Sequence, residues 1–161
     1  MIRARLSSIM VMTLALGACA SQPKPLQGDF FERPTPHTAV LGDYTGTAVR
    51  WGGRIVQLEP RTDTTCFEMI ATRLAPNGRP FWAGDDTNGR FIACRVGFYD
   101  PAVFQVNREV TFTGHIVAYD TRHVGEHEYR FPRIDIEDVH LWPVREPVDP
   151  RRARSPWWGS W

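Results

Sequence analysis

The sequence lacks a hydrophobic run long enough to cross a bilayer. Its longest uncharged apolar stretch begins after Arg3 and Arg5 and covers roughly a dozen residues before Cys19, whereas a helix rising ~1.5 Å per residue needs about 20 residues to span ~30 Å of hydrocarbon. Basic residues, a short apolar core and the small pair Gly17-Ala18 are typical of a secretory signal peptide. We therefore predict export rather than a membrane-spanning helix.

The motif LGAC at residues 16–19 ends this apolar stretch and resembles the lipobox of bacterial lipoprotein precursors. The resemblance implies that residues 1–18 are removed and that Cys19 is acylated as the mature N-terminus. Several acyl chains hold a protein stably, because each buried methylene contributes about 0.8 kcal/mol. Ala20 and Ser21 follow in place of a retaining aspartate, which by the same resemblance favours the outer membrane, with the body on its periplasmic face. An ordinary signal peptide ending beside a chance cysteine is the alternative.

The mature chain also lacks an excess of charge of either sign. Residues 1–18 hold two of the 19 basic residues and no acidic residue, so their removal leaves 17 basic against 18 acidic residues. Nucleic-acid-binding proteins normally show a strongly basic face. We therefore expect no nucleic-acid partner. The expected partners are the outer membrane, through the lipid anchor, and an envelope protein or cell-wall component.

Cysteine is scarce, and no C-x-x-C spacing is present. Beyond Cys19 the chain has only Cys66 and Cys94, which lie in separate predicted strands. In the oxidising periplasm we expect this pair to form a disulfide, which would contribute about 3.5 kcal/mol in the chain-entropy model. Two buried free thiols are the alternative.

A catalytic constellation is missing as well. There is no G-x-S-x-G motif, and RWGGR lacks the strand-to-helix setting of a phosphate-binding loop. His123 and His127 flank Gly125 in a predicted turn, where the two imidazoles do not meet as they do in a helical zinc motif. The pair Asp85-Asp86 is typical of a solvated turn. We expect no enzymatic activity, no cofactor and no metal site.

What the sequence does contain is one domain between two proline-rich ends. Residues 19–37 are predicted to form the lipidated N-terminus and an extended tether, because four prolines fall between residues 21 and 36. Residues 144–161 are predicted to be a disordered tail rich in Pro, Arg and Trp. If that tail binds anything, its composition favours lipid headgroups or a cell-wall component. Residues 38–143 remain for the folded domain.

Five segments of this domain alternate between apolar and polar residues with the period of a β-strand. Gly52-Gly53 predicts a bulge or a sharp bend in the first segment, and a phase change predicts a bulge or a twist near Asp138. One short helical turn is predicted at residues 99–106. We expect a mostly-β fold, a small antiparallel OB-like barrel of five to six strands, with a sandwich as the alternative. The segments are residues 47–60, 64–76, 89–98, 109–120 and 133–143.

Four aromatic residues are candidates for an exposed binding surface, with core packing as the alternative. They are Trp51, Tyr129, Phe131 and Trp142. A small-ligand carrier would instead need a cavity of several hundred cubic ångströms, although the interior of so small a barrel is expected to be filled.

Four stretches of the domain together resemble the Slp family, the starvation-inducible outer-membrane lipoproteins of Gram-negative bacteria. They are residues 49–56, 89–104, 108–116 and 129–143. The resemblance implies a lipid-anchored periplasmic β-domain without established enzymatic activity, linked in some members to carbon starvation, stationary phase and acid stress. It places Cys19 at the lipidated position, whereas Cys66, Cys94 and the Trp-rich tail fall outside the shared pattern. We expect a non-enzymatic structural or binding protein of the envelope, with a small-ligand or cell-wall carrier as the alternative.

Overall fold

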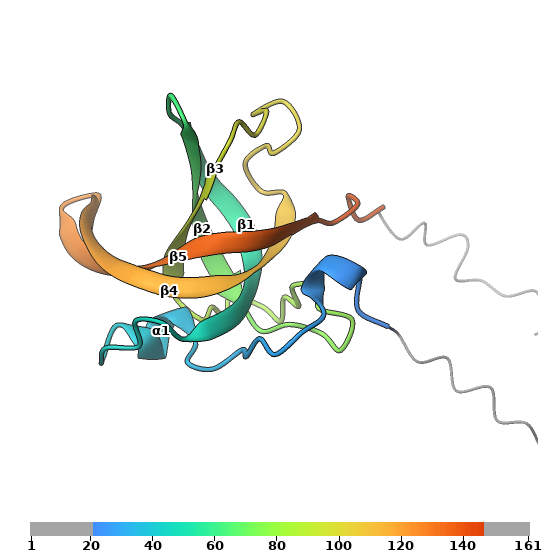
Figure 1. The fold of residues 1–161 in the computed structure, drawn as a ribbon, viewed down its shortest axis with the longest axis horizontal. Coiled ribbons are helices and arrows are strands. Elements are labelled where there is room, and N and C mark those ends of the chain that lie inside the picture. The colour runs from blue at the N-terminus through green and yellow to red at the C-terminus, as the bar shows by residue number, and fades with distance from the viewer. Residues whose placement is uncertain (1–20, 147–161) are drawn as a thin grey trace, which may run out of the picture.

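Five strands close into a single barrel in the order β1-β2-β3-β5-β4 (Figure 1). The computed structural model describes residues 21–146. The strands β3 and β5 pair in parallel, and the other neighbours pair antiparallel, an arrangement typical of the five-stranded OB-type barrel. The predicted small β-barrel is confirmed, and the sandwich is not formed. The strands are β1 (Ala48–Pro60), β2 (Thr64–Thr72), β3 (Arg90–Val96), β4 (Glu109–Val124) and β5 (His127–Leu141).

Helical structure is confined to short segments. The 3-10 turn η1 (Lys24–Leu26) and the helix α1 (Pro36–Ala39) precede the barrel. Between β3 and β4, where a helical turn is predicted, the Phe104 amide donates to the carbonyl oxygen of Asp100 at 2.9 Å and closes a single turn. Within residues 21–146 no helix has the length and apolar character that a membrane crossing requires.

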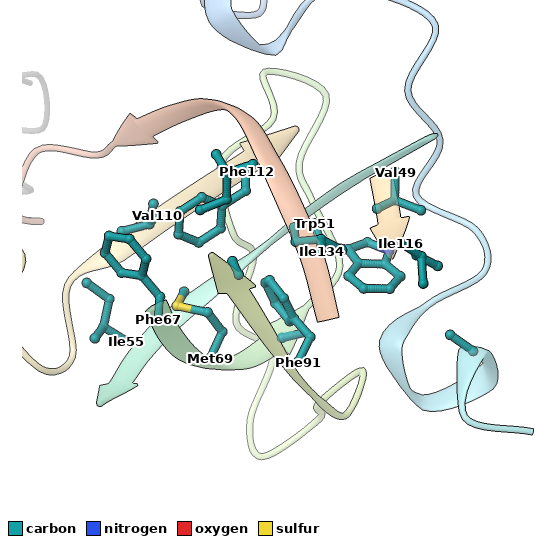
Figure 2. Packing of buried hydrophobic residues seen from close by; sticks show 14 residues of the cluster. Val49, Trp51, Ile55, Phe67, Met69, Phe91, Val110, Phe112, Ile116 and Ile134 are labelled. Atoms are coloured by element: carbon teal, nitrogen blue, oxygen red, sulfur yellow. The ribbon is translucent and has the colours of Figure 1, made fainter. Parts of the chain in front are cut away.

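Aromatic and aliphatic side chains fill the barrel, and Figure 2 shows them pointing into the space between the strands. The Phe67 ring lies 5.2 Å from that of Phe112, and the Trp51 ring lies 5.3 Å from that of Phe91. Such tilted and edge-on pairs add to the free energy of burying apolar area. The interior is therefore a packed core rather than a ligand chamber, as expected for a barrel of this size.

The glycine pair in β1 serves a different purpose from the one predicted. The register of β1 against β2 shifts between Ile55 and Gln57, two residues beyond the pair, so the bulge predicted at Gly52-Gly53 is misplaced. A Cβ at Gly53 would instead collide with the carbonyl oxygen of Ile70, so the glycine permits close approach of the two backbones.

The bulge predicted near Asp138 is present in β5. The register shifts between Thr113 and Gly114 of β4, which face Asp138 and Ile136, so Glu137 is the extra residue.

The segment predicted to be an extended tether is packed against the barrel from Gln22 onward. Leu26 is fully buried, and the Arg50 guanidinium donates 3.0 Å hydrogen bonds to the Gln22 side chain and to the Leu26 carbonyl. The Arg50 amide also donates to the carbonyl oxygen of Phe31. The tether prediction is thus wrong for residues 22–31, because the buried Leu26, the hydrogen bonds of Arg50 and the backbone pairing of Phe31 with β1 dock a segment that has no periodicity. The predicted signal peptide, Cys19 and residues 147–161 of the predicted tail lie outside the described residues.

Candidate functional site

The four aromatic candidates do not gather on the surface. Trp51 is only 3% exposed and donates from its indole nitrogen to the carbonyl oxygen of Pro34, and Phe131 is fully buried. Trp142, 7% exposed, donates to the Thr111 hydroxyl. Tyr129 is half-buried with its ring 5.0 Å from that of Phe131. The predicted aromatic surface is therefore wrong, because three of its members are buried: Trp51 in the barrel core, Phe131 in a smaller cluster beside the cysteines, and Trp142 just beyond the end of β5.

The two remaining cysteines do come together. Cys66 of β2 and Cys94 of β3 lie directly opposite each other in the antiparallel ladder and form a disulfide. They pack with Ile92 and Phe131 in a small cluster separate from the main core. The predicted disulfide is confirmed, and it ties two neighbouring strands at one end of the barrel.

An open groove of about 590 Å³, the disulfide groove, lies over this cystine. Its apolar floor includes the disulfide and Val117 of β4, whose side chain is 44% exposed. Charged side chains of both signs surround the floor: Arg61 and Asp63 from the turn between β1 and β2, and Arg133 and Asp135 from β5. Four segments distant in sequence thus contribute to one hollow.

The groove carries groups that can bind a ligand. Two guanidinium groups and two carboxylates can pair with a ligand that carries both charges, and the floor offers apolar contact. In the sequence, only the cysteine pair indicated the disulfide groove, because the residues of its rim come from separate strands.

A second polar cluster lies where β5 ends. Glu109 is 7% exposed, and its carboxylate accepts hydrogen bonds from Arg79 at 2.7 Å and from Arg145 at 3.0 Å. Arg145 also donates to the carbonyl oxygen of Pro80. The first residues after the barrel are thus held by the loop between β2 and β3, although residues 144–161 were predicted to be disordered as a whole.

The histidines do not converge on a common point. His115 Nδ1 lies 2.6 Å from a carboxylate oxygen of Glu137 on the barrel exterior. His140 packs edge-on to Trp142 with ring centres 4.3 Å apart, and burial lowers the pKa of its imidazole. Over residues 21–146, no three His, Cys, Asp or Glu side chains are arranged to hold a metal ion.

A closed five-stranded barrel with a disulfide between neighbouring strands defines a small β-barrel protein. The family model described as "Outer membrane lipoprotein Slp family" matches residues 16–161. The chain belongs to this family, which associates it with the outer membrane.

The proteins that resemble the chain include a lipoprotein and a solved structure. The "Uncharacterized lipoprotein YeaY" of Escherichia coli (strain K12) is 26% identical over 151 residues, an alignment that covers 89% of this chain and 76% of that protein. The crystal structure of a small single-stranded DNA-binding protein from Streptomyces coelicolor aligns with a TM-score of 0.40 and 12% identity, covering 60% of this chain and 94% of that one. A likeness of that size has no bearing on function.

Proposed function

We propose that the mature chain is a non-enzymatic binding protein, held in the outer membrane by acylated Cys19 with its barrel on the periplasmic face. Membership of the Slp family and the LGAC motif at residues 16–19 support this proposal. The same family resemblance supports a role during starvation or envelope stress.

The observation that carries a binding role is the disulfide groove. Its volume of about 590 Å³ falls within the usual range of ligand sites, roughly 300 to 1,000 Å³. Arg61 and Arg133 offer donors for carboxylates, and Asp63 and Asp135 offer acceptors for amines and hydroxyls. The peptides and glycans of the cell wall carry these groups and lie in the periplasm. We therefore assign a cell-wall component as the ligand class.

The anchor is tested by replacing Cys19 with Ala in the full-length precursor. Intact mass of the native protein should show a lipid-sized increment, and the protein should float with outer membranes; the variant should lose both. Protease added to intact cells should spare the barrel and should degrade it once the outer membrane is permeabilised. An unmodified chain in the soluble periplasm contradicts the proposal, and so does digestion in intact cells.

The groove is tested with Val117→Arg, which places a long cation over its floor. We expect the purified native protein to sediment with isolated cell-wall sacculi and the variant to lose this binding. Val103→Arg is the matched control, because Val103 is 47% exposed, close to the 44% of Val117, but lies in the loop between β3 and β4. Equal sedimentation of both variants would reject the groove as the site, and no sedimentation of the native protein would reject a cell-wall ligand.

A further inference from the structure

The docked N-terminal segment limits how far the barrel can lie from its anchor. Gln22 is fixed to the barrel by hydrogen bonds to Arg50 and to the loop between β2 and β3. Two residues, Ala20 and Ser21, lie between Cys19 and Gln22. A fully extended chain advances at most about 3.6 Å per residue, so the three steps from Cys19 to Gln22 keep their Cα atoms within about 11 Å of each other. If Cys19 is acylated, as proposed above, the surface around Gln22 must lie against the bilayer.

Three segments share that surface, which we call the anchor end: residues 22–26, 73–82 and 142–145. Gln22 Nε2 donates to the carbonyl oxygen of Pro76 at 3.3 Å, and Arg79 Nη2 donates to that of Pro143 at 2.7 Å. In Figure 1 both described ends of the chain lie on one side of the barrel, with the light-green loop between β2 and β3 beside η1.

The side chains of the anchor end suit the headgroup layer of a membrane. Phe81 is 43% exposed, and the Arg73 guanidinium lies 4.6 Å from the centre of its ring. Lys24 is exposed, and Arg145 is half-exposed. Aromatic rings and guanidinium groups are the side chains that favour the level of lipid phosphates.

The contact does not depend on long-range attraction. The exposed Asp85 and Asp86 follow in the same loop and offset part of the positive charge. The short connection between Cys19 and Gln22, rather than net charge, keeps the Arg73–Phe81 pair near the lipid, because the anchor end cannot move far from the acylated residue.

We propose that the anchor end rests on the periplasmic leaflet, with Arg73 and Phe81 among the phospholipid headgroups. The strand β2 then directs the rest of the barrel away from the membrane. Its nine residues, from Thr72 at the anchor end to Thr64 at the disulfide groove, rise about 3.3 Å each and extend about 26 Å. The lipid thus orients the disulfide groove toward the periplasm, where a cell-wall ligand would approach.

Hydrogen exchange of the mature lipoprotein tests this orientation. The protein is placed, one copy each, in nanodiscs of phosphatidylethanolamine and phosphatidylglycerol, and the Cys19→Ala variant is mixed with the same nanodiscs. We expect amides of residues 73–82 to exchange about fivefold or more slowly in the anchored protein, and those of residues 97–107 to be unchanged. Equal exchange of residues 73–82, or slowing at residues 97–107 instead, overturns the orientation.

The outcomes separate this inference from the anchor on which it rests. If the native protein lacks the lipid mass and elutes apart from the nanodiscs, the anchor fails, and the orientation fails with it. If the protein is acylated and elutes with the nanodiscs while residues 73–82 exchange freely, only the orientation fails.

Two paired variants test the side chains. Arg73→Gln combined with Phe81→Ser should abolish most of the slowing in nanodiscs. The matched control combines Arg95→Gln with Phe98→Ser, an arginine and an exposed phenylalanine at the opposite end of the barrel, and should retain it. Unchanged exchange in the strands of both variants shows that the barrel is intact. Retained slowing in the first variant refutes the role of the Arg73–Phe81 pair.

Discussion

At Gly53 the backbones of β1 and β2 approach so closely that the position accommodates a hydrogen atom and nothing larger. The obstacle is a backbone carbonyl of a paired strand, which cannot rotate away as a side chain can. The pKa of His140 also depends on its surroundings, because its imidazole is partly buried beside Trp142 and burial lowers the pKa. A prediction about stability follows for each of these two residues.

Gly53→Ala should lower the free energy of unfolding by about 3 kcal/mol, because β1 or β2 must shift to admit the methyl group. Gly42→Ala is the control, since a Cβ there meets only the ring of Tyr44, at 3.0 Å, and the cost should stay within about 0.5 kcal/mol. Urea unfolding followed by tryptophan fluorescence measures both. Similar losses of unfolding free energy in the two variants would show that β1 and β2 can move apart at Gly53 at little cost.

His140 should make the fold sensitive to mild acid. Burial lowers the pKa of His140 in the folded state, so as pH falls through about 6.5 the unfolded chain takes up a proton before the folded chain does. The free energy of unfolding therefore falls as the pH decreases from the unfolded-state pKa of His140 to its lower folded-state pKa. His140→Asn should lose less stability than the native protein between pH 7.5 and about 5, whereas the exposed His123→Asn should match the native protein. Identical pH profiles for all three proteins would contradict this.

At the scale of elements, the disulfide joins β2 and β3 at the end of the barrel that carries the groove. This position matters because β3 has only seven residues and touches β5 through a short parallel ladder. The cross-link closes a loop over a sequence separation of 28 residues.

Replacing both cysteines, Cys66→Ala with Cys94→Ala, should lower the free energy of unfolding by about 3.5 kcal/mol. Denaturant unfolding of the native protein with dithiothreitol should show a similar loss, and the double variant should not respond to the reductant. A response of the double variant would mean that the reductant acts elsewhere. A native protein unaffected by complete reduction would mean that strand pairing alone holds β3.

At the scale of the whole molecule, the N-terminal segment packs against the barrel from Gln22 onward, so the proposed anchor at Cys19 would hold the barrel close to the membrane. Leu26 is the apolar contact that holds this segment, and its Cδ1 lies near Gly78 in the loop between β2 and β3. The orientation on the membrane that is proposed above rests on this packing.

Leu26→Ala should free the segment without unfolding the barrel. The lost burial weakens docking by about 2 to 3 kcal/mol, so amides of residues 22–31 should exchange faster while those of the strands keep their protection. Leu41→Ala is the control, because Leu41 is 79% exposed. Faster exchange throughout the strands would show that the segment is part of the cooperative core.

Strand positions could be predicted from the sequence, whereas the burial of aromatic residues could not. Alternation along residues 109–120 located β4, and the phase change near Asp138 located a bulge, because both are local consequences of strand geometry. Trp51 and Trp142 could not be assigned to the core or the surface in the same way. An aromatic residue on a strand faces inward or outward according to which strands close the barrel, and that pairing is not local.

The sequence by itself determined the family and the five strands, and it predicts an export signal that ends at Cys19 and leaves two cysteines to pair. These depend on neighbours along the chain, through hydrophobic period, spacing and residue type. Only the tertiary structure decided that Gly53 serves close approach, that residues 22–31 are docked, and that the turn after β1 and the strands β2 to β5 form a groove over the cystine. The physical reason is that each of these arises from contacts between segments far apart in sequence, which a local pattern does not encode.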